Sequence, residues 1–475
     1  MTDYEKIEEF YTLHSKEFLI IEEKIYKYFS IPNFIISSTI KRRLHHIICK
    51  NGINSKFLTK KSIIFSLLSY WPIMIVFKSM SLLGKKSKNC KCKVAYEEWC
   101  IIGHHFNTFY NSIYNALLPS NQKIYATTKT YCDNFNKDME VIQATHNFLF
   151  EKNICKTIFR ASFNNYFKLI YFSIKYKFDF IGLYVRLIGS IARHETESKG
   201  LDIDFLISAH DNGYDAFRYF IYKKNGIKNI ILIQNGLRGN NNPSEGSLYL
   251  YADFYLSYGK RQSQMLLGLH TNKTIHCGSF PLYQYFLKYE NVQVDYDVIL
   301  IEQITNIDFE KSFYMGTFLR IIDHLKRFAD EYKNLKVAYR TRNARVIGTQ
   351  QRYLPVDKKL IGCNVIFESL QSENSYEAVM KSKIVVTYCS SLGIEAVGLG
   401  KKVLFCNYDN LSYIPNQNSV AVILSGVYEE FKDKLLYLLN SDYKNLIHCY
   451  SDLKSDYMNI ARNPVDEIID IINGS

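Results

Sequence analysis

Along most of this chain, short runs of apolar residues are separated by longer stretches in which apolar and polar residues follow helical spacing. Short runs rich in Val, Ile, Leu and Tyr, bounded by Gly, Asn or Asp, predict buried β-strands. They lie at Gln122–Thr127, Ile203–Ser208, Asn229–Gln234, Leu248–Ser257, Asp297–Glu302, Lys336–Tyr339, Asn364–Glu368, Lys383–Thr387, Lys402–Phe405 and Val420–Leu424. Helical spacing fills the intervals at Phe106–Leu118, Lys156–Ile191, Tyr214–Lys224, Ser312–Tyr332, Ser375–Met380, Leu392–Leu399, Val427–Leu439 and Val465–Ile472. Strands that alternate with helices predict α/β architecture with parallel sheets.

One βαβ segment carries the sharpest of these patterns. Lys383–Thr387 predicts a strand, Leu392–Leu399 a helix and Lys402–Phe405 a second strand. Gly400 ends the helix, because glycine adopts the left-handed cap conformation without steric cost. The polar turn Tyr388–Ser391 therefore follows a strand and begins a helix. Open parallel sheets bind ligands at such turns, and the free N–H groups there favour a phosphate.

Glu395 lies one turn into this predicted helix. The helix dipole alone favours a carboxylate in the first turn. A second interpretation gives the residue a ligand, in which Glu395 accepts hydrogen bonds from the vicinal hydroxyls of a ribose and the phosphates rest on Ser390 and Ser391. Short Gly/Ser motifs are weak evidence by themselves. The residues alone leave both interpretations open.

The segment resembles the nucleotide-binding half of GT-B fold glycosyltransferases, which show a turn of small residues, then Glu-Ala, then Gly and a hydrophobic strand. The matching residues are Ser390, Ser391, Gly393, Glu395, Ala396, Gly400, Val403, Leu404 and Phe405. The succession IQNGLRG, ADFYLSYGK and GSFP is similar to the amino half of the same enzymes. The chain departs from the family at Tyr388–Ser391, where an acidic and glycine-bearing cluster is usual. That departure leaves retaining or inverting chemistry open.

The resemblance implies two Rossmann-like domains that face a cleft. We assign residues 94–286 to an acceptor domain and 287–475 to a donor domain that binds the nucleotide-sugar, after a mostly helical extension at 1–93. The length of 475 residues agrees with two domains, since it exceeds the size of one ordinary core. Such enzymes generally need no bound metal, so we expect no metal and no cofactor. The pair Asp202 and Asp204 has the spacing of a metal-binding DxD motif, but it begins a strand instead of ending one.

Functional groups of such a fold come from strand ends at the cleft. In the second half these are Glu302, Arg340, Arg342 and the Ser390-Ser391 turn, which we assign to the nucleotide-sugar. Arginine clamps phosphate through two parallel N–H bonds, which lysine cannot do. Ordinary surface charge is the alternative for each arginine.

In the first half the strand Ile203–Ser208 is followed by His210 and Asp211. Glycosyl transfer needs a base for the acceptor hydroxyl, and these two residues are the candidates. The alternative is that Asp211 caps the next helix. The loop that contains Asn235, Gly236 and Arg238 is a candidate contact for the acceptor or the donor sugar, against a plain glycine turn.

Composition narrows the choice of partners. Formal net charge is +13, which suits nucleic acid, an anionic membrane face or a phosphorylated substrate. No zinc-finger, basic-zipper or RNA-recognition signature is present, so we expect no nucleic acid. The eleven cysteines form no even framework and indicate free thiols in a reducing cytoplasm.

Ser62–Leu83 is the most apolar segment. Pro72 and Lys78 make it a poor membrane span. It is either a buried core element or a segment in the bilayer interface, with Trp71 at the boundary and flanking lysines on anionic headgroups. The second interpretation places the protein peripherally on the inner face of the cytoplasmic membrane.

Together these observations predict a metal-independent GT-B glycosyltransferase of bacterial surface-polysaccharide biosynthesis, such as lipopolysaccharide or capsule. It would move a sugar from a UDP-, GDP- or CMP-sugar onto a surface glycan or a lipid-linked saccharide. The alternatives are a sugar-nucleotide epimerase or a polyol-phosphate transferase on the same fold, and a non-enzymatic basic protein that binds nucleic acid or membrane.

Overall fold

The structure is a computed structural model of the chain. It describes residues 3–51, 60–83, 89–99, 101–117, 121–128, 130–132, 139–143, 152–163, 165–238, 249–266, 268–289, 291–302, 315–341, 359–368, 372, 374–415, 417 and 419–474. The chain forms two compact units. Unit 1 comprises residues 1–256, 264–275 and 468–475, and unit 2 comprises 257–263 and 276–467. The expected helical extension at 1–93 is part of unit 1, and the last helix, α18 (Pro464–Asn473), begins in unit 2 and ends in unit 1.

Unit 1 contains a seven-stranded sheet in the order β3-β2-β1-β4-β5-β6-β7, in which every pair from β3 to β6 is parallel. Its strands are β1 (Cys90–Glu98), β2 (Gln122–Ala126), β3 (Val141–Gln143), β4 (Leu201–Ser208), β5 (Ile227–Ile233), β6 (Tyr251–Ser257) and β7 (His270–His276). The chain thus runs outward from β1 to β3, returns to β4 beside β1, and runs outward on the other side. This is the doubly wound order, with its reversal point between β1 and β4.

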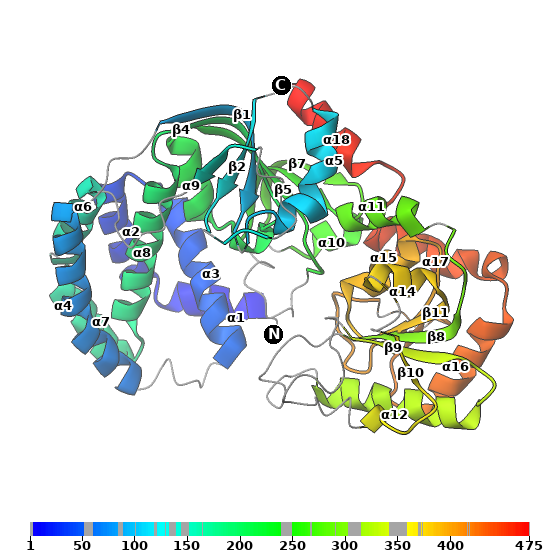
Figure 1. Cartoon of the computed structure of the whole chain (residues 1–475). Helices are drawn as coiled ribbons and strands as arrows, with labels where there is room; N and C mark the ends of the chain where they lie inside the picture. The colour runs from blue at the N-terminus through cyan, green and yellow to red at the C-terminus, as the bar shows by residue number, and fades with distance from the viewer. Residues whose placement is uncertain are drawn as a thin grey trace. The chain divides into compact units, whose positions relative to one another are not determined.

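The helices of unit 1 form a layer against this sheet and a helical part that packs on α8 (Figure 1). They are α1 (Asp3–Leu13), α2 (Ser15–Phe29), α3 (Asn33–Asn51), α4 (Lys60–Leu83), η2 (Phe106–Tyr110), α5 (Asn111–Ala116), α6 (Lys152–Phe163), α7 (Tyr166–Tyr176), α8 (Phe180–Ser198), η3 (Asp211–Gly213) and α9 (Ala216–Lys224). Their shared core is mostly aromatic and isoleucine side chains, centred on Phe180, Tyr184, Ile188 and Ile191 of α8. The most apolar segment of the sequence is therefore a helix, α4.

Unit 2 is a six-stranded parallel sheet in the order β10-β9-β8-β11-β12-β13. Its elements are β8 (Tyr296–Ile301), β9 (Val337–Arg340), β10 (Ile366–Phe367), β11 (Ser382–Thr387), β12 (Lys402–Cys406), β13 (Val422–Ile423), α11 (Phe280–Tyr289), α12 (Met315–Glu331), α14 (Ser375–Met380), α15 (Ser391–Gly398), α16 (Tyr428–Asn440) and α17 (Tyr443–Tyr457). The short α10 (Lys260–Gln264) spans a unit boundary. The strand order is again doubly wound, with the reversal between β8 and β11.

The predicted α/β class with two Rossmann-like units is confirmed by these two sheets. Gly400, with a φ of +75°, ends α15 as expected, and its N–H donates to the Val397 carbonyl at 3.0 Å. The strand β1 was not predicted, because Lys91, Lys93, Glu97 and Glu98 interrupt its apolar pattern. None of the helices in the described parts of the chain is long and apolar enough to cross a membrane.

Gly393 sets how closely α15 packs on its sheet. A Cβ atom there would lie 2.4 Å from the Thr387 Cγ2 atom and 3.3 Å from the Phe405 ring. Thr387 ends β11 and Phe405 lies on β12, so any side chain at position 393 would push the helix off both strands. Glycine is required here for the close approach of backbone to sheet.

We predict that Gly393→Ala lowers the free energy of unfolding of unit 2 by about 1–3 kcal/mol, the usual cost of overpacking a core. The matched control is Gly316→Ala in α12, where the added Cβ meets no atom within 4 Å. That variant should be neutral or slightly stabilising, because alanine favours a helix over glycine. Chemical denaturation of both variants measures the difference, and equal stabilities would contradict the packing argument.

Candidate functional site

The reversal point of unit 2 lies between the carboxyl ends of β8 and β11, and α15 begins directly after β11. Ser390 caps this helix, its Oγ accepting the Leu392 N–H at 3.2 Å. The next residue, Ser391, is half-exposed, and neither its N–H nor its hydroxyl has a hydrogen-bond partner among the described residues. The amino end of α15 therefore presents a free N–H and a hydroxyl at the edge where doubly wound sheets bind ligands.

Glu395 is buried beneath this turn, only 3% exposed. Its Oε1 atom accepts two hydrogen bonds, from the Ser279 hydroxyl and from the Tyr376 hydroxyl at 3.0 Å. Both hydroxyls donate to Oε1, and Oε2 has no partner among the described residues. Burial raises the pKa of Glu395 to about 7, and the two hydroxyls offset only part of that shift. In the described part of the chain no cation pairs with this carboxylate, which is unusual for a buried charge.

The two donors to Glu395 come from segments far apart in the sequence. Ser279 precedes α11, and its motif, Gly278–Pro281, which the resemblance assigns to the amino half of the chain, lies in unit 2. Tyr376 lies in α14 and stacks on Tyr285 of α11, with ring centroids 4.7 Å apart. The short spacing of Ser390 to Glu395 gave no sign of either donor.

The other predicted residues of unit 2 are less open than expected. Arg340 is 2% exposed and donates to the Glu368 carboxylate at 2.9 Å and to the Ser372 carbonyl at 3.2 Å. Glu302 is also 2% exposed and accepts the Tyr339 hydroxyl at 2.9 Å. Both printed bonds come from the Nη1 atom of Arg340, and its Nε atom is buried without a hydrogen-bond partner among the described residues. That Arg340 clamps a phosphate stays a prediction. Arg342 lies outside the described residues.

The reversal point of unit 1 brings Trp99, which follows β1, onto His210, which follows β4. The two rings are stacked, with centroids 4.0 Å apart and planes 12° from parallel. The indole N–H of Trp99 donates to His105 Nε2 at 3.1 Å. Gly213 makes room for the His210 ring, because a Cβ at that position would lie 2.4 Å from the His210 Cε1 atom.

His210 is held as a neutral imidazole. Burial lowers its pKa to about 2, and the positive charges of Arg218 and Arg42 act in the same direction. Its Nδ1 atom is buried and has no hydrogen-bond partner among the described residues. A neutral imidazole carries one proton and one nitrogen lone pair, so the ring can accept a proton.

Asp211, the other candidate base, lies in a buried ion pair. It is fully buried and paired with Arg238, whose Nε atom donates to Asp211 Oδ2 at 3.1 Å while Nη2 donates to Oδ1. A carboxylate in a two-bond pair with arginine is a poor base. Asp211 does not cap the next helix either: Asp215 does, accepting the Arg218 N–H at 2.8 Å.

The loop after β5 is shaped by the same pair. Arg238, 3% exposed, is turned inward to Asp211 and is not free to approach a sugar. Asn235 and Gly236 stay half-exposed, and Gly236 has a φ of +133°, which strongly favours glycine. The Gln234 amide closes the turn by donating to the Gly236 carbonyl at 2.7 Å.

Two neighbouring carboxylates at the end of β1 organise this edge, and the sequence patterns missed both. Glu98 accepts backbone N–H bonds from Gly103 (3.2 Å), His105 (3.1 Å) and Phe106 (2.5 Å), so it shapes the turn that follows Trp99. Its Oε2 atom also lies 3.1 Å from His105 Nδ1. Glu98 is fully buried and His105 is 3% exposed.

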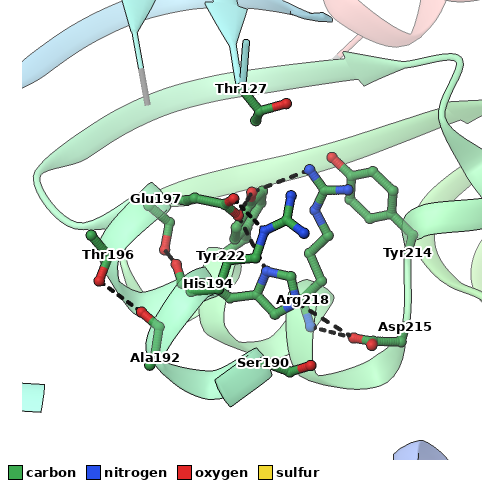
Figure 2. A network of polar contacts seen from close by, with 12 residues as sticks. Thr127, Ser190, Ala192, His194, Thr196, Glu197, Tyr214, Asp215, Arg218 and Tyr222 are labelled. Carbon is green, nitrogen blue, oxygen red and sulfur yellow. Dashed lines mark hydrogen bonds and ion pairs between the residues drawn. The ribbon is translucent and has the colours of Figure 1, made fainter. Parts of the chain in front are cut away.

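Glu97 belongs to a buried ion network behind the same strand, part of which Figure 2 shows. It accepts the Tyr214 hydroxyl at 2.8 Å and pairs with Arg218, which also donates to the Tyr222 hydroxyl at 3.2 Å. Tyr222 in turn donates to Glu197 at 3.0 Å. The network thus joins β1, α9 and α8.

Further charges extend this network. The Arg193 Nε atom donates to Glu197 at 2.7 Å, and His194 Nδ1 lies 3.3 Å from the same carboxylate. Although burial opposes ionisation, these partners hold the pKa of Glu197 well below its usual range. Single ionic residues within apolar helices give no signal in a sequence, so this network was not predictable.

No group of three His, Cys, Asp or Glu side chains in the described ranges is arranged to hold a metal ion. Asp202 and Asp204 lie near the amino end of β4 and pair with Lys91 (3.4 Å) and Lys228 (2.7 Å). None of the nine cysteines whose side chains the structure describes is in a disulfide bond.

The burial of Glu395 yields a pH prediction. Its pKa is about 7 folded and about 4.5 unfolded. Between these values the folded carboxyl keeps a proton that the unfolded chain releases, so stability is present below pH 4.5 and is lost as pH rises through 7. Glu395→Gln mimics the protonated form. We predict that the variant exceeds the original chain by roughly 1–3 kcal/mol in free energy of unfolding at pH 8.

The same pair compared at pH 4.5 is the internal control, because Glu395 is then protonated and the two proteins should be equally stable. Urea denaturation at both values measures the effect. A variant less stable than the original chain at pH 8 would show that the ionised carboxylate stabilises unit 2, against this account.

No protein-family model matches the sequence, and no curated protein does either. Solved structures with a similar course of the chain include the wall teichoic acid polymerase TagF, at 12% identity and a TM-score of 0.47, covering 88% of this chain and 98% of that one. Another is the UDP-GlcNAc 2-epimerase of Methanocaldococcus jannaschii in complex with UDP-GlcNAc and UDP, at 12% identity and a TM-score of 0.44, covering 81% of this chain and 100% of that one. By the order of its own strands, the chain is an α/β protein of two Rossmann-like units.

Proposed function

We propose that this protein is a glycosyltransferase that moves a sugar from a nucleotide-activated donor to a saccharide acceptor. The observation that carries the proposal is the β11–α15 turn. It combines a doubly wound reversal point, a helix amino end where the Ser391 N–H and hydroxyl have no partner among the described residues, and the Oε2 of Glu395, likewise without a partner there, one turn further. A phosphate on Ser391 and a ribose hydroxyl on Glu395 would use all three.

Unit 1 supplies what the acceptor and the chemistry need. The half-exposed indole of Trp99 is a flat apolar surface of the kind that packs against sugar rings, and it holds His210 by stacking. In the proposal His210 is the base. Its pKa is low because of burial and nearby arginines, so an anionic substrate group bound beside the ring would offset these charges and raise the pKa towards the useful range.

The charged groups at this edge favour transfer over epimerisation. An epimerase needs several acid and base groups free around one sugar, whereas Asp211 and Glu98 are committed to Arg238 and to backbone N–H groups. The Nδ1 atom of His210 has no hydrogen-bond partner in the described part of this edge. The donor in the proposal is a UDP-, GDP- or CMP-sugar, and the acceptor is a surface glycan or a lipid-linked saccharide.

The nucleotide site is tested with Ser391→Asp. The helix dipole favours an aspartate at this end, so the variant should fold, while its charge repels the phosphates. We predict that UDP, GDP, CMP and their sugars raise the unfolding temperature of the original chain, and that the variant weakens the affinity of the best ligand at least about tenfold.

Ser455→Asp, at an exposed place on α17, adds the same charge elsewhere in unit 2 and is the matched control. It should bind like the original chain. Equal affinities of all three proteins would remove the phosphate from α15, and no stabilisation by any nucleotide would end the proposal.

The base is tested with His210→Ala. With the nucleotide-sugar that binds best, we expect release of the free nucleotide to fall at least about a hundredfold while its affinity stays within a few-fold. His448→Ala, at an exposed histidine of α17, is the control and should keep full turnover.

The products separate the alternatives. An altered sugar still joined to its nucleotide would indicate an epimerase, and release of CMP from a CDP-polyol would indicate a polyol-phosphate transferase. Binding without turnover of any donor would indicate a protein that is not an enzyme. Turnover that survives His210→Ala would move the base to another residue.

A further inference from the structure

Three neighbouring helices of unit 1 turn apolar side chains to solvent. On α4 the outward side carries Ile64, Phe65, Leu68, Ile75 and Val76, each between 50% and 73% exposed. Their spacing of three, four, seven and eight residues places them on one continuous side of the helix. The opposite side, with Ile63, Tyr70, Met74 and Phe77, is buried in the core of unit 1.

The helix α7 repeats this arrangement. Phe167, Tyr171 and Ile174 are 79%, 57% and 64% exposed, and they follow one another at spacings of four and three residues. Lys168 and Lys175 lie beside them on the same exposed side. The buried side of α7, with Leu169 and Phe172, faces the core.

The helix α6 places positive charge next to these apolar sides. Its exposed positions are Lys152, Lys156 and Arg160 at successive spacings of four residues, followed by Phe163. The three helices touch one another through side chains: the Trp71 ring of α4 lies 6.0 Å from Phe163 and 4.9 Å from Tyr166, and Lys78 of α4 lies over the Phe159 ring of α6 at 5.2 Å.

All three helices pack their buried sides on α8, so their exposed sides lie together on the side away from it (Figure 1). We call this surface the α4/α6/α7 face. Soluble proteins rarely expose so many large apolar side chains together unless the surface meets a partner.

The charged residues of this face are all basic, which favours a negatively charged partner. The sequences of α4, α6 and α7 contain eight lysines or arginines and no aspartate or glutamate. The whole chain has 59 basic and 46 acidic residues, so the absence of acidic residues from all three helices is a local feature. A protein partner would have to be both apolar and strongly acidic. A bilayer with anionic headgroups offers apolar depth and negative charge in adjacent layers.

We propose that the α4/α6/α7 face binds the surface of an anionic membrane, with Phe65, Leu68 and Phe167 in the interface and Lys152, Lys156 and Arg160 on the headgroups. The helices lie on the membrane and do not cross it. The proposal is independent of the transferase chemistry and extends to α6 and α7 an interfacial role that the sequence left open for Ser62–Leu83 alone.

The test is co-sedimentation of the full chain with vesicles of phosphatidylcholine alone or mixed with phosphatidylglycerol. We expect binding to the anionic vesicles at low salt, release as salt rises, and much weaker binding to the neutral ones. Replacing Lys152, Lys156 and Arg160 with Gln should lower the partition coefficient roughly a hundredfold, since each charge near such a surface gives about a fivefold effect.

A matched charge control replaces three exposed lysines of unit 2, Lys333, Lys336 and Lys444, with Gln. It removes the same charge and should leave vesicle binding within a few-fold. The apolar part is tested by Phe65→Ser with Leu68→Ser and Phe167→Ser, against Tyr437→Ser with Ile447→Ser, whose side chains are 54% and 55% exposed in unit 2. The first set should lose binding and the second should keep it.

The contact is located with Trp71, the one tryptophan left in Trp99→Phe, because the chain has two. Its fluorescence should be quenched by vesicles that carry brominated acyl chains. Thermal unfolding and nucleotide binding of each variant show that it is folded.

The proposal would be overturned if the chain did not bind anionic vesicles at low salt. It would also be overturned if the control with Lys333, Lys336 and Lys444 replaced lost as much vesicle binding as the variant of α6. A dimer in analytical ultracentrifugation that Phe65→Ser dissociates would also overturn it, in favour of a second copy on this face. Failure here leaves nucleotide binding untouched, so the two proposals fail separately.

Discussion

The structure of unit 1 depends on two adjacent buried carboxylates at the end of β1, Glu97 and Glu98. Successive side chains of a strand point to opposite faces of the sheet, so Glu97 and Glu98 serve two different networks although they are neighbours in sequence. Glu97 pairs with Arg218 and Tyr214, and so fixes α9 and, through Tyr222 and Glu197, α8. Glu98 collects three backbone N–H groups and sets the turn that presents Trp99. Removing either carboxylate would leave its buried partners unsatisfied, which typically costs several kcal/mol.

The candidate site of unit 1 depends on these networks at a distance. Trp99 is positioned by the turn that Glu98 shapes, and His210 stacks on Trp99. The positive charge that depresses the pKa of His210 comes partly from Arg218 and Arg42, residues of the ion network and its border. Residues that stabilise the fold of unit 1 therefore also contribute to the lowered pKa of His210. A substitution in the network is expected to change that pKa.

Unit 2 differs from unit 1 in both respects. Its helix α15 packs closely on the sheet because Gly393 has no side chain. Its buried carboxylate, Glu395, accepts hydrogen bonds from two hydroxyls and pairs with no cation among the described residues. Hydroxyls stabilise a charge less than an ion pair does, which is why the pKa of Glu395 lies near neutrality while that of Glu197 lies well below its usual range. A carboxylate left in this state is sensitive to any further hydrogen-bond donor that reaches Oε2.

The sequence by itself determined the α/β class and two Rossmann-like units, because strand and helix periods are local properties. It also located the Ser390 turn, Gly400 and the apolar segment that forms α4. Only the tertiary structure decided which polar residues are open and which are committed: Asp211 to Arg238, Arg340 to Glu368, and Glu395 to Ser279 and Tyr376. It also revealed β1, whose charged residues hide its burial, and the shared outward side of α4, α6 and α7. The physical reason is that partners far apart in sequence decide whether a charge is satisfied, and no local pattern records them.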